Sequence, residues 1–105
     1  MSKVKHVVLL KFKSSAKEKI DEAMAALASL KEKIPGLLDF SGGRNTSQEG
    51  LSKGFTHGFV MTFEDEASRD AYLPHPEHEK VKELVFGLLD GGLEGVQAMD
   101  WSEAG

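Results

Sequence analysis

Residues 54–63, GFTHGFVMTF, alternate between two rows of side chains over their whole length. One row is bulky and the other is small; they are Phe55, His57, Phe59, Met61 and Phe63, and Thr56, Gly58, Val60 and Thr62. A period of two residues predicts a β-strand, because successive side chains of a strand point to opposite faces of the sheet. This segment is the clearest strand in the chain, and it requires partner strands.

Other segments supply those partners and the helices that cover them. Strands are predicted at 4–12, 37–43 and 95–101, and helices at 14–34, 64–73 and 76–90. The order strand, helix, strand, strand, helix, strand is that of the ferredoxin-like α+β fold, which has an antiparallel sheet with both helices on one face. We therefore predict one domain over residues 1–105, with the first and third strands adjacent in the centre of the sheet.

Local signals fix the expected helix ends. Ser14 or Ser15 is a suitable N-cap for the first helix, with Glu18 as a capping-box partner, and Asp65 is suited to cap the second. Pro76 is suited to the first turn of the last helix. The apolar side chains expected in the core are Ile20, Met24, Leu27, Leu30 and Ile34, and Val81, Leu84, Val85, Leu88 and Leu89.

The two rows of the third strand suggest how the sheet is covered. Because Gly58 and its small neighbours would let a helix approach closely, we expect the small row to face the helices and the bulky row to face away. An exposed bulky row would be a large apolar patch, and such patches usually mark an interface. We therefore predict a homodimer packed through the sheet face, enclosing an apolar chamber for a small apolar or aromatic molecule.

Composition and charge exclude several classes of function. The net charge is −4, which argues against a nucleic-acid partner, since phosphates need a basic face. The chain has no cysteine, so disulfides, thiol nucleophiles and zinc–thiolate sites are excluded. No apolar run approaches the length of a signal-peptide core or a membrane span, so we expect a cytoplasmic protein without a membrane partner.

The stretch AYLPHPEHEK, residues 71–80, gathers groups that can carry acid–base chemistry. It holds the single tyrosine, Tyr72, and two histidines, His75 and His78. Two structural interpretations stay open, with His75 capping the helix and His78 bonded to Glu77 or Glu79. A metal site that adds Glu79 and His57 is a weaker interpretation, because His75 precedes the helix and Pro76 stiffens the link to His78.

Three segments resemble the stress-responsive A/B barrel (Dabb) family of dimeric α+β barrel proteins. They are KHVVLLKFK near the start, GFTHGFVMTFED in the middle, and AYLPHPEHEKV after it. The most specific feature is a THxF-type strand followed by a YxxHPxH segment. The resemblance covers essentially the whole chain and implies a homodimer, in a family that includes plant proteins associated with stress and heat tolerance.

The resemblance also implies site residues. The family includes a plant polyketide cyclase in which a tyrosine and a histidine perform the acid–base work of an aldol ring closure. They match Tyr72 and His78 here, which are the catalytic candidates. Two further cavity histidines match His6 and His57, although the residue pattern alone favours for each a buried neutral imidazole that has a hydrogen-bond partner.

Two other residues complete the predicted ligand site. Phe59 lies in the bulky row beside His57, and Met24 lies where the cyclase has aromatic residues. No cofactor and no metal are predicted. Three functions remain open: a dimer that binds a small apolar or aromatic molecule, a cofactor-independent cyclase-like enzyme, and a purely structural stress-stability protein.

Overall fold

Four strands form one antiparallel sheet in the order β2-β3-β1-β4. The structure is a computed structural model, and it describes residues 2–103. The strands are β1 (Val4–Leu10), β2 (Leu37–Arg44), β3 (His57–Phe63) and β4 (Val96–Ser102). The predicted central pair is confirmed, because β1 and β3 are adjacent and Val8 lies opposite Phe59.

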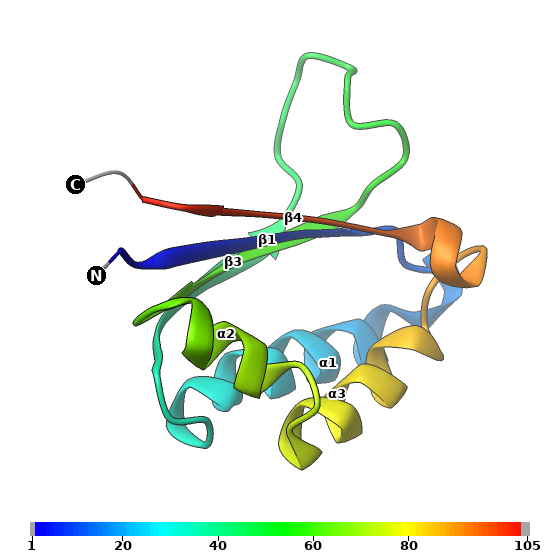
Figure 1. The fold of residues 1–105 in the computed structure, drawn as a ribbon. Helices are drawn as coiled ribbons and strands as arrows, with labels where there is room; N and C mark the ends of the chain where they lie inside the picture. Colours follow the sequence, from blue (N-terminus) through cyan, green and yellow to red (C-terminus); the bar gives the residue numbers. More distant parts are fainter. Residues whose placement is uncertain (1, 104–105) are drawn as a thin grey trace.

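Three α-helices cover one face of this sheet (Figure 1). They are α1 (Lys17–Ser29), α2 (Glu66–Tyr72) and α3 (Pro76–Phe86). Short 3₁₀ turns at Ser14–Ala16, Leu30–Glu32 and Gly92–Gly95 complete the connections. The arrangement confirms the predicted ferredoxin-like α+β fold. Within residues 2–103, no helix is long and apolar enough to cross a membrane.

The helix ends follow the sequence signals in two cases out of three. Asp65 caps α2 by accepting a hydrogen bond from the Ser68 amide at 2.8 Å, and Pro76 occupies the first turn of α3. The capping box predicted for the first helix is wrong. Ser14 and Ser15 form a 3₁₀ turn instead, so the cap position of α1 falls to Ala16, which has no side-chain hydrogen bond to give.

The bulky row of β3 faces the helices, which corrects the prediction that it faces away. Phe59, Met61 and Phe63 are all buried, and Phe63 packs against Tyr72 of α2 with ring centroids 5.0 Å apart. The physical reason is the size of the apolar area: the largest apolar side chains gain most by leaving water, and the helices are the cover that one chain can provide. The main core therefore lies between sheet and helices.

Gly58 serves the opposite face from the one predicted. A Cβ built there would lie 3.1 Å from Cδ2 of Leu9, its register partner on β1. The glycine therefore allows Leu9 to lie close to β3 on the face that carries no helix, which we call the outer face. Leu9, Met99 and Trp101 are exposed there.

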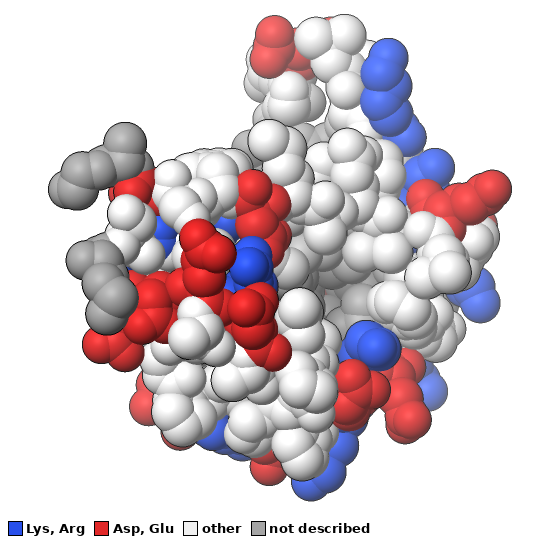
Figure 2. Space-filling model, viewed as in Figure 1, with Lys and Arg blue, Asp and Glu red and all other residues white. Residues whose placement is uncertain are grey.

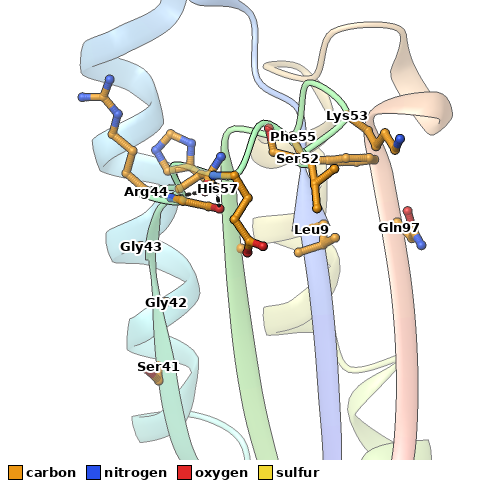
Figure 3. Close-up of a pocket in the computed structure, with 15 residues that line it drawn as sticks. Leu9, Ser41, Gly42, Gly43, Arg44, Ser52, Lys53, Phe55, His57 and Gln97 are labelled. Atoms are coloured by element: carbon orange, nitrogen blue, oxygen red, sulfur yellow. Dashed lines mark hydrogen bonds between the residues drawn. The ribbon is translucent and has the colours of Figure 1, made fainter.

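A long connection between β2 and β3 rises on the side of the sheet away from the helices (Figure 1). It encloses a hollow of about 750 Å³ against the outer face. Leu9 lies on its strand floor, and Ser52 and Phe55 come from the connection (Figure 3). One copy of the chain thus leaves an open hollow and exposed apolar groups on this face.

Candidate functional site

An apolar cavity of about 170 Å³ lies between the sheet and the helices. It is lined by His6, Val8 and Leu10 of β1, Phe59 of β3, Val96 and Ala98 of β4, Leu27 of α1, Tyr72 and Leu73 at the end of α2, and His78, Lys82, Val85 and Phe86 of α3. Four predicted site residues meet here, namely His6, Phe59, Tyr72 and His78. This cavity lies inside one copy, between sheet and helices, and not between two sheets as predicted for the chamber, because the bulky row faces the helices.

Tyr72 and His78 stack on each other at the helix side of the cavity. Their ring centroids are 4.1 Å apart and the planes differ by 30°. Residues six apart would not meet on one straight helix, but the break between α2 and α3 folds them together. Pro76 starts the new helix, and His75 caps it by accepting a hydrogen bond from the Glu77 amide at 3.1 Å, as one interpretation of the sequence anticipated.

A backbone hydrogen bond sets the tautomer of His78. Its Nδ1 lies 2.8 Å from the carbonyl oxygen of Leu73, which can only accept, so Nδ1 carries the proton and donates it. The predicted bonds to Glu77 or Glu79 are not formed. Burial lowers the pKa of His78 below its usual 6.5, so the ring is neutral at pH 7 and Nε2 keeps a free lone pair.

Tyr72 is suited to donating a hydrogen bond rather than to accepting a proton. Its side chain is 1% exposed, and burial, assisted by the charge of Asp100, raises the pKa of the hydroxyl well above its usual value. The cavity therefore offers one neutral donor, the Tyr72 hydroxyl, and one acceptor, Nε2 of His78.

His6 forms the floor of the cavity and belongs to a polar network. Its Nδ1 lies 2.7 Å from Oδ1 of Asp100, and Oδ2 of Asp100 accepts from Arg69 at 2.8 Å. Burial acts to raise the pKa of Asp100, but the hydrogen bonds from His6 and Arg69 outweigh it, so the pKa lies below its usual range. The carboxylate stays charged and orients the His6 ring.

Sequence reasoning missed Asp100 and Arg69. Asp100 lies directly opposite His6 in the pairing of β4 with β1, and Arg69 reaches it from α2. Figure 2 shows the surface setting, with acidic groups gathered around basic ones over the region of α2. A period-two count along β4 places Asp100 on the same face as Val96 and Ala98, so the one charge in that row was the available signal.

His57 and Met24 do not join this cavity. Both line a separate hollow of about 460 Å³ that lies between the start of α1, the end of β2 and the start of β3. His57 Nδ1 lies 2.9 Å from the Thr56 hydroxyl, and its ring meets Phe12 edge-on with centroids 5.1 Å apart. The predicted ligand-binding set of His6, His57, Phe59 and Met24 is thus divided between two places.

The described residues offer little for a metal ion. Over residues 2–103, no three histidine or carboxylate side chains cluster closely enough to hold one. His75, His78 and Glu79, which the metal interpretation grouped with His57, have other partners: the Glu77 amide, the Leu73 carbonyl and Lys82. The chemistry of the cavity is therefore that of one hydroxyl, two imidazoles, the ammonium of Lys82 and apolar walls.

The sheet order, the helices on one face and the cavity between them define a ferredoxin-like α+β domain. The family described as the Stress responsive A/B Barrel Domain, Dabb, matches residues 4–103. The chain belongs to this family, and the resemblance found in the sequence is confirmed.

Known proteins of the family are similar over most of their length. The stress-response A/B barrel domain-containing protein HS1 of Arabidopsis thaliana is 38% identical over 88 residues, which are 83% of this chain and 81% of that protein. Olivetolic acid cyclase of Cannabis sativa is 33% identical over 76 residues, 71% of this chain and 75% of the cyclase. A dimeric ferredoxin-like protein of unknown function from Jannaschia superposes with a TM-score of 0.84 at 34% identity, covering 94% of this chain and 97% of that one.

Proposed function

We propose that this protein binds a small, ring-sized apolar molecule carrying one polar oxygen in the cavity between sheet and helices. The observation that carries the proposal is the Tyr72–His78 stack at the edge of a mainly apolar cavity. Ligand sites in proteins combine apolar walls with a few placed polar groups. Here the walls come from every layer of the fold, and the polar groups are a donor and an acceptor.

The volume limits the ligand to about one ring. An empty apolar cavity of about 150 Å³ takes up benzene, and this cavity measures about 170 Å³. Phenol matches it, because its ring fits the apolar walls while its hydroxyl can accept from Tyr72 and donate to Nε2 of His78. A two-ring molecule such as 2-naphthol exceeds the space.

Calorimetric titration with phenol, toluene and 2-naphthol tests this proposal. We expect phenol to bind most tightly, toluene to bind more weakly for lack of a polar group, and 2-naphthol not to bind. Ala98→Leu, which fills the mouth of the cavity, should abolish phenol binding. Ala71→Leu, at an exposed position of α2, is the control and should leave phenol binding unchanged. Equal binding of phenol to both variants would contradict the proposal.

Acid–base catalysis in the same cavity is a second candidate, in line with the name of the cyclase relative. It is favoured by the tautomer of His78, because a neutral ring with a free Nε2 can take a proton next to a carbonyl while the Tyr72 hydroxyl stabilises the oxygen that becomes negative. The small volume, about 170 Å³, argues against a long substrate. The chemistry supported is enolisation of a small ketone.

Deuterium exchange tests catalysis separately from binding. With acetophenone in D₂O, NMR would follow loss of the methyl protons, which requires proton removal and return at carbon. Catalysis predicts acceleration by the wild type, loss in His78→Gln, and slowing in Tyr72→Phe. Exchange at the uncatalysed rate, with ligand binding intact, would leave the protein a binder.

We also propose that two copies pair through the outer face. Three observations support this: the exposed apolar side chains Leu9, Met99 and Trp101, the hollow beneath the β2–β3 connection, and the dimeric description of the Jannaschia relative. In a two-fold dimer, each copy would cover these groups on the other. The cavity lies on the other side of the sheet, so each copy keeps its own site.

A further inference from the structure

The hollow that holds His57 and Met24 differs in chemistry from the cavity. It is wider, about 460 Å³, and its floor is apolar, with Phe12 and Ile20 buried and Met24 half-buried. It shares no lining residue with the cavity of Tyr72 and His78. Its volume falls in the range of small-molecule sites, roughly 300 to 1,000 Å³.

Cations surround this apolar floor. Lys13 and Lys17 come from the start of α1 and the turn before it, and Arg44 comes from the end of β2, against one carboxylate, Asp21. Arg44 lines both this hollow and the outer-face hollow, and its side chain extends toward the side where α1 lies (Figure 3). Over the described residues 2–103, none of these three cations has a carboxylate within ion-pair distance. A protein of net charge −4 thus carries a locally basic hollow.

His57 adds a polar, uncharged ring to the wall of the hollow, and this ring does not compete with an anion for the cations. The Thr56 hydroxyl donates to the Leu10 carbonyl at 3.3 Å, so Nδ1 of His57 must donate to Thr56, and Nε2 is left as an acceptor. Burial, then the charge of Arg44, lower the pKa of His57, and Asp21 opposes them. The ring is therefore a neutral aromatic surface held edge-on to Phe12.

From this combination we infer that the hollow is a second binding site, for a small aromatic or aliphatic carboxylate. The apolar part would lie on Phe12, Ile20 and Met24, and the carboxylate would meet the guanidinium of Arg44 and the ammonium of Lys17. Arginine pairs with carboxylates through two parallel hydrogen bonds, which gives orientation as well as attraction. A cleft lined by one sign of charge also raises the local concentration of the opposite ion.

The two sites should therefore separate ligands by charge. The cavity has neutral polar groups and one lysine at its edge, Lys82, and it suits an uncharged ring. The basic hollow suits the same ring with a carboxylate attached. Benzoate and benzyl alcohol are a matched pair for this test, because they differ mainly in charge.

Histidine-ring NMR with benzoate tests the inference, since His57 lines the basic hollow and His78 lines the cavity. We expect benzoate to shift His57 and to leave His78 in place, and benzyl alcohol to bind the hollow at least tenfold more weakly. Lys17→Gln/Arg44→Gln should weaken benzoate binding at least tenfold. Lys31→Gln/Lys80→Gln, which removes the same two positive charges from exposed side chains outside the hollow, should change it less than twofold.

Three results would overturn the inference. In the first, benzoate shifts the His78 signal instead of the His57 signal. In the second, benzoate binds Lys17→Gln/Arg44→Gln as tightly as the wild type. In the third, inorganic phosphate displaces benzoate as well as another aromatic carboxylate does. The last result would mean that the basic groups attract any anion without using the apolar floor. The substituted side chains are exposed, so the variants are expected to fold.

Discussion

The two faces of the sheet differ in what covers them: one packs against the helices, and the other carries no helix. The helix face buries Phe59, Met61 and Phe63 and holds the cavity with Tyr72 and His78. Along the same strands, the side chains of the outer face alternate with those of the helix face. The outer face has exposed apolar side chains and a hollow under the long β2–β3 connection. One row of each strand is thus buried in the core and around the cavity, while the other row leaves apolar side chains exposed to a partner.

The largest predicted difference between the faces is in stability. Phe63→Ala should lower the free energy of unfolding by about 3–5 kcal/mol, because it opens a cavity in a fully buried site. Met99→Ala, on the outer face, should act mainly through assembly and therefore depend on protein concentration. Urea unfolding at two concentrations measures both. If Met99→Ala lost more unfolding free energy than Phe63→Ala, and did so at every protein concentration, the main core would lie on the outer face, which would contradict the structure.

The Asp100 network should give the next largest effect. Asp100→Asn weakens charge-assisted bonds to His6 and Arg69 and should cost about 1.5–3 kcal/mol of unfolding free energy. Asp70 also pairs with Arg69 at 2.8 Å, but its side chain is 65% exposed, against 23% for Asp100. Asp70→Asn should therefore cost less than about 1 kcal/mol. Equal losses in urea unfolding would show that burial does not distinguish the two pairs.

Assembly should respond to the outer face alone. Trp101→Asp places a charge in the proposed interface and should weaken pairing about tenfold or more, or about 1.4 kcal/mol. Leu93→Asp is the matched control, since Leu93 is exposed but lies in the turn before β4. Analytical ultracentrifugation across a dilution series measures both. Pairing that survives Trp101→Asp but fails in Leu93→Asp would place the interface elsewhere.

The smallest predicted effect is the pH dependence of stability. The pKa of His78 in the folded chain lies below its usual 6.5, mainly because of burial. Below about pH 6.5 the unfolded chain therefore binds more protons than the folded chain, so stability is complete above that pH and falls as the pH falls. His57 contributes with the same sign.

Urea unfolding at pH 7.5 and pH 5 checks this sign. Wild type should be less stable at pH 5, and His78→Gln should lose less on acidification, because the amide can still donate to Leu73 without titrating. Asp100 and Asp65 act at lower pH, since their pKa values lie below the usual range for carboxylates. Greater stability at pH 5 than at pH 7.5 would contradict the assignment of neutral histidines.

The sequence allowed the fold to be predicted because its signals are local. Alternation in β3, Asp65 as a cap and Pro76 at a helix start each act over a few residues, and all three hold. The direction of the bulky row did not follow from Gly58, because a small row is compatible with a close helix or with a close neighbour on the same sheet, and here it accommodates Leu9.

The site could be predicted only in part for a similar reason. Tyr72 and His78 share one short motif, so the bend between them could be read from its prolines. The bond between His6 and Asp100 joins residues 94 positions apart, and it depends on the exact register of β4 against β1. No local pattern fixes that register. The separation of His57 from His6 likewise depends on distance along β3.

A histidine-ring NMR titration of nitrogen-labelled protein with phenol tests whether a ligand binds between the sheet and the helices. The cavity account predicts that His78 and His6 shift together and saturably, that His57 stays in place, and that Ala98→Leu removes the shifts. Shifts confined to His57, or no shift at His78 while phenol binds, would contradict a ligand site between the sheet and the helices.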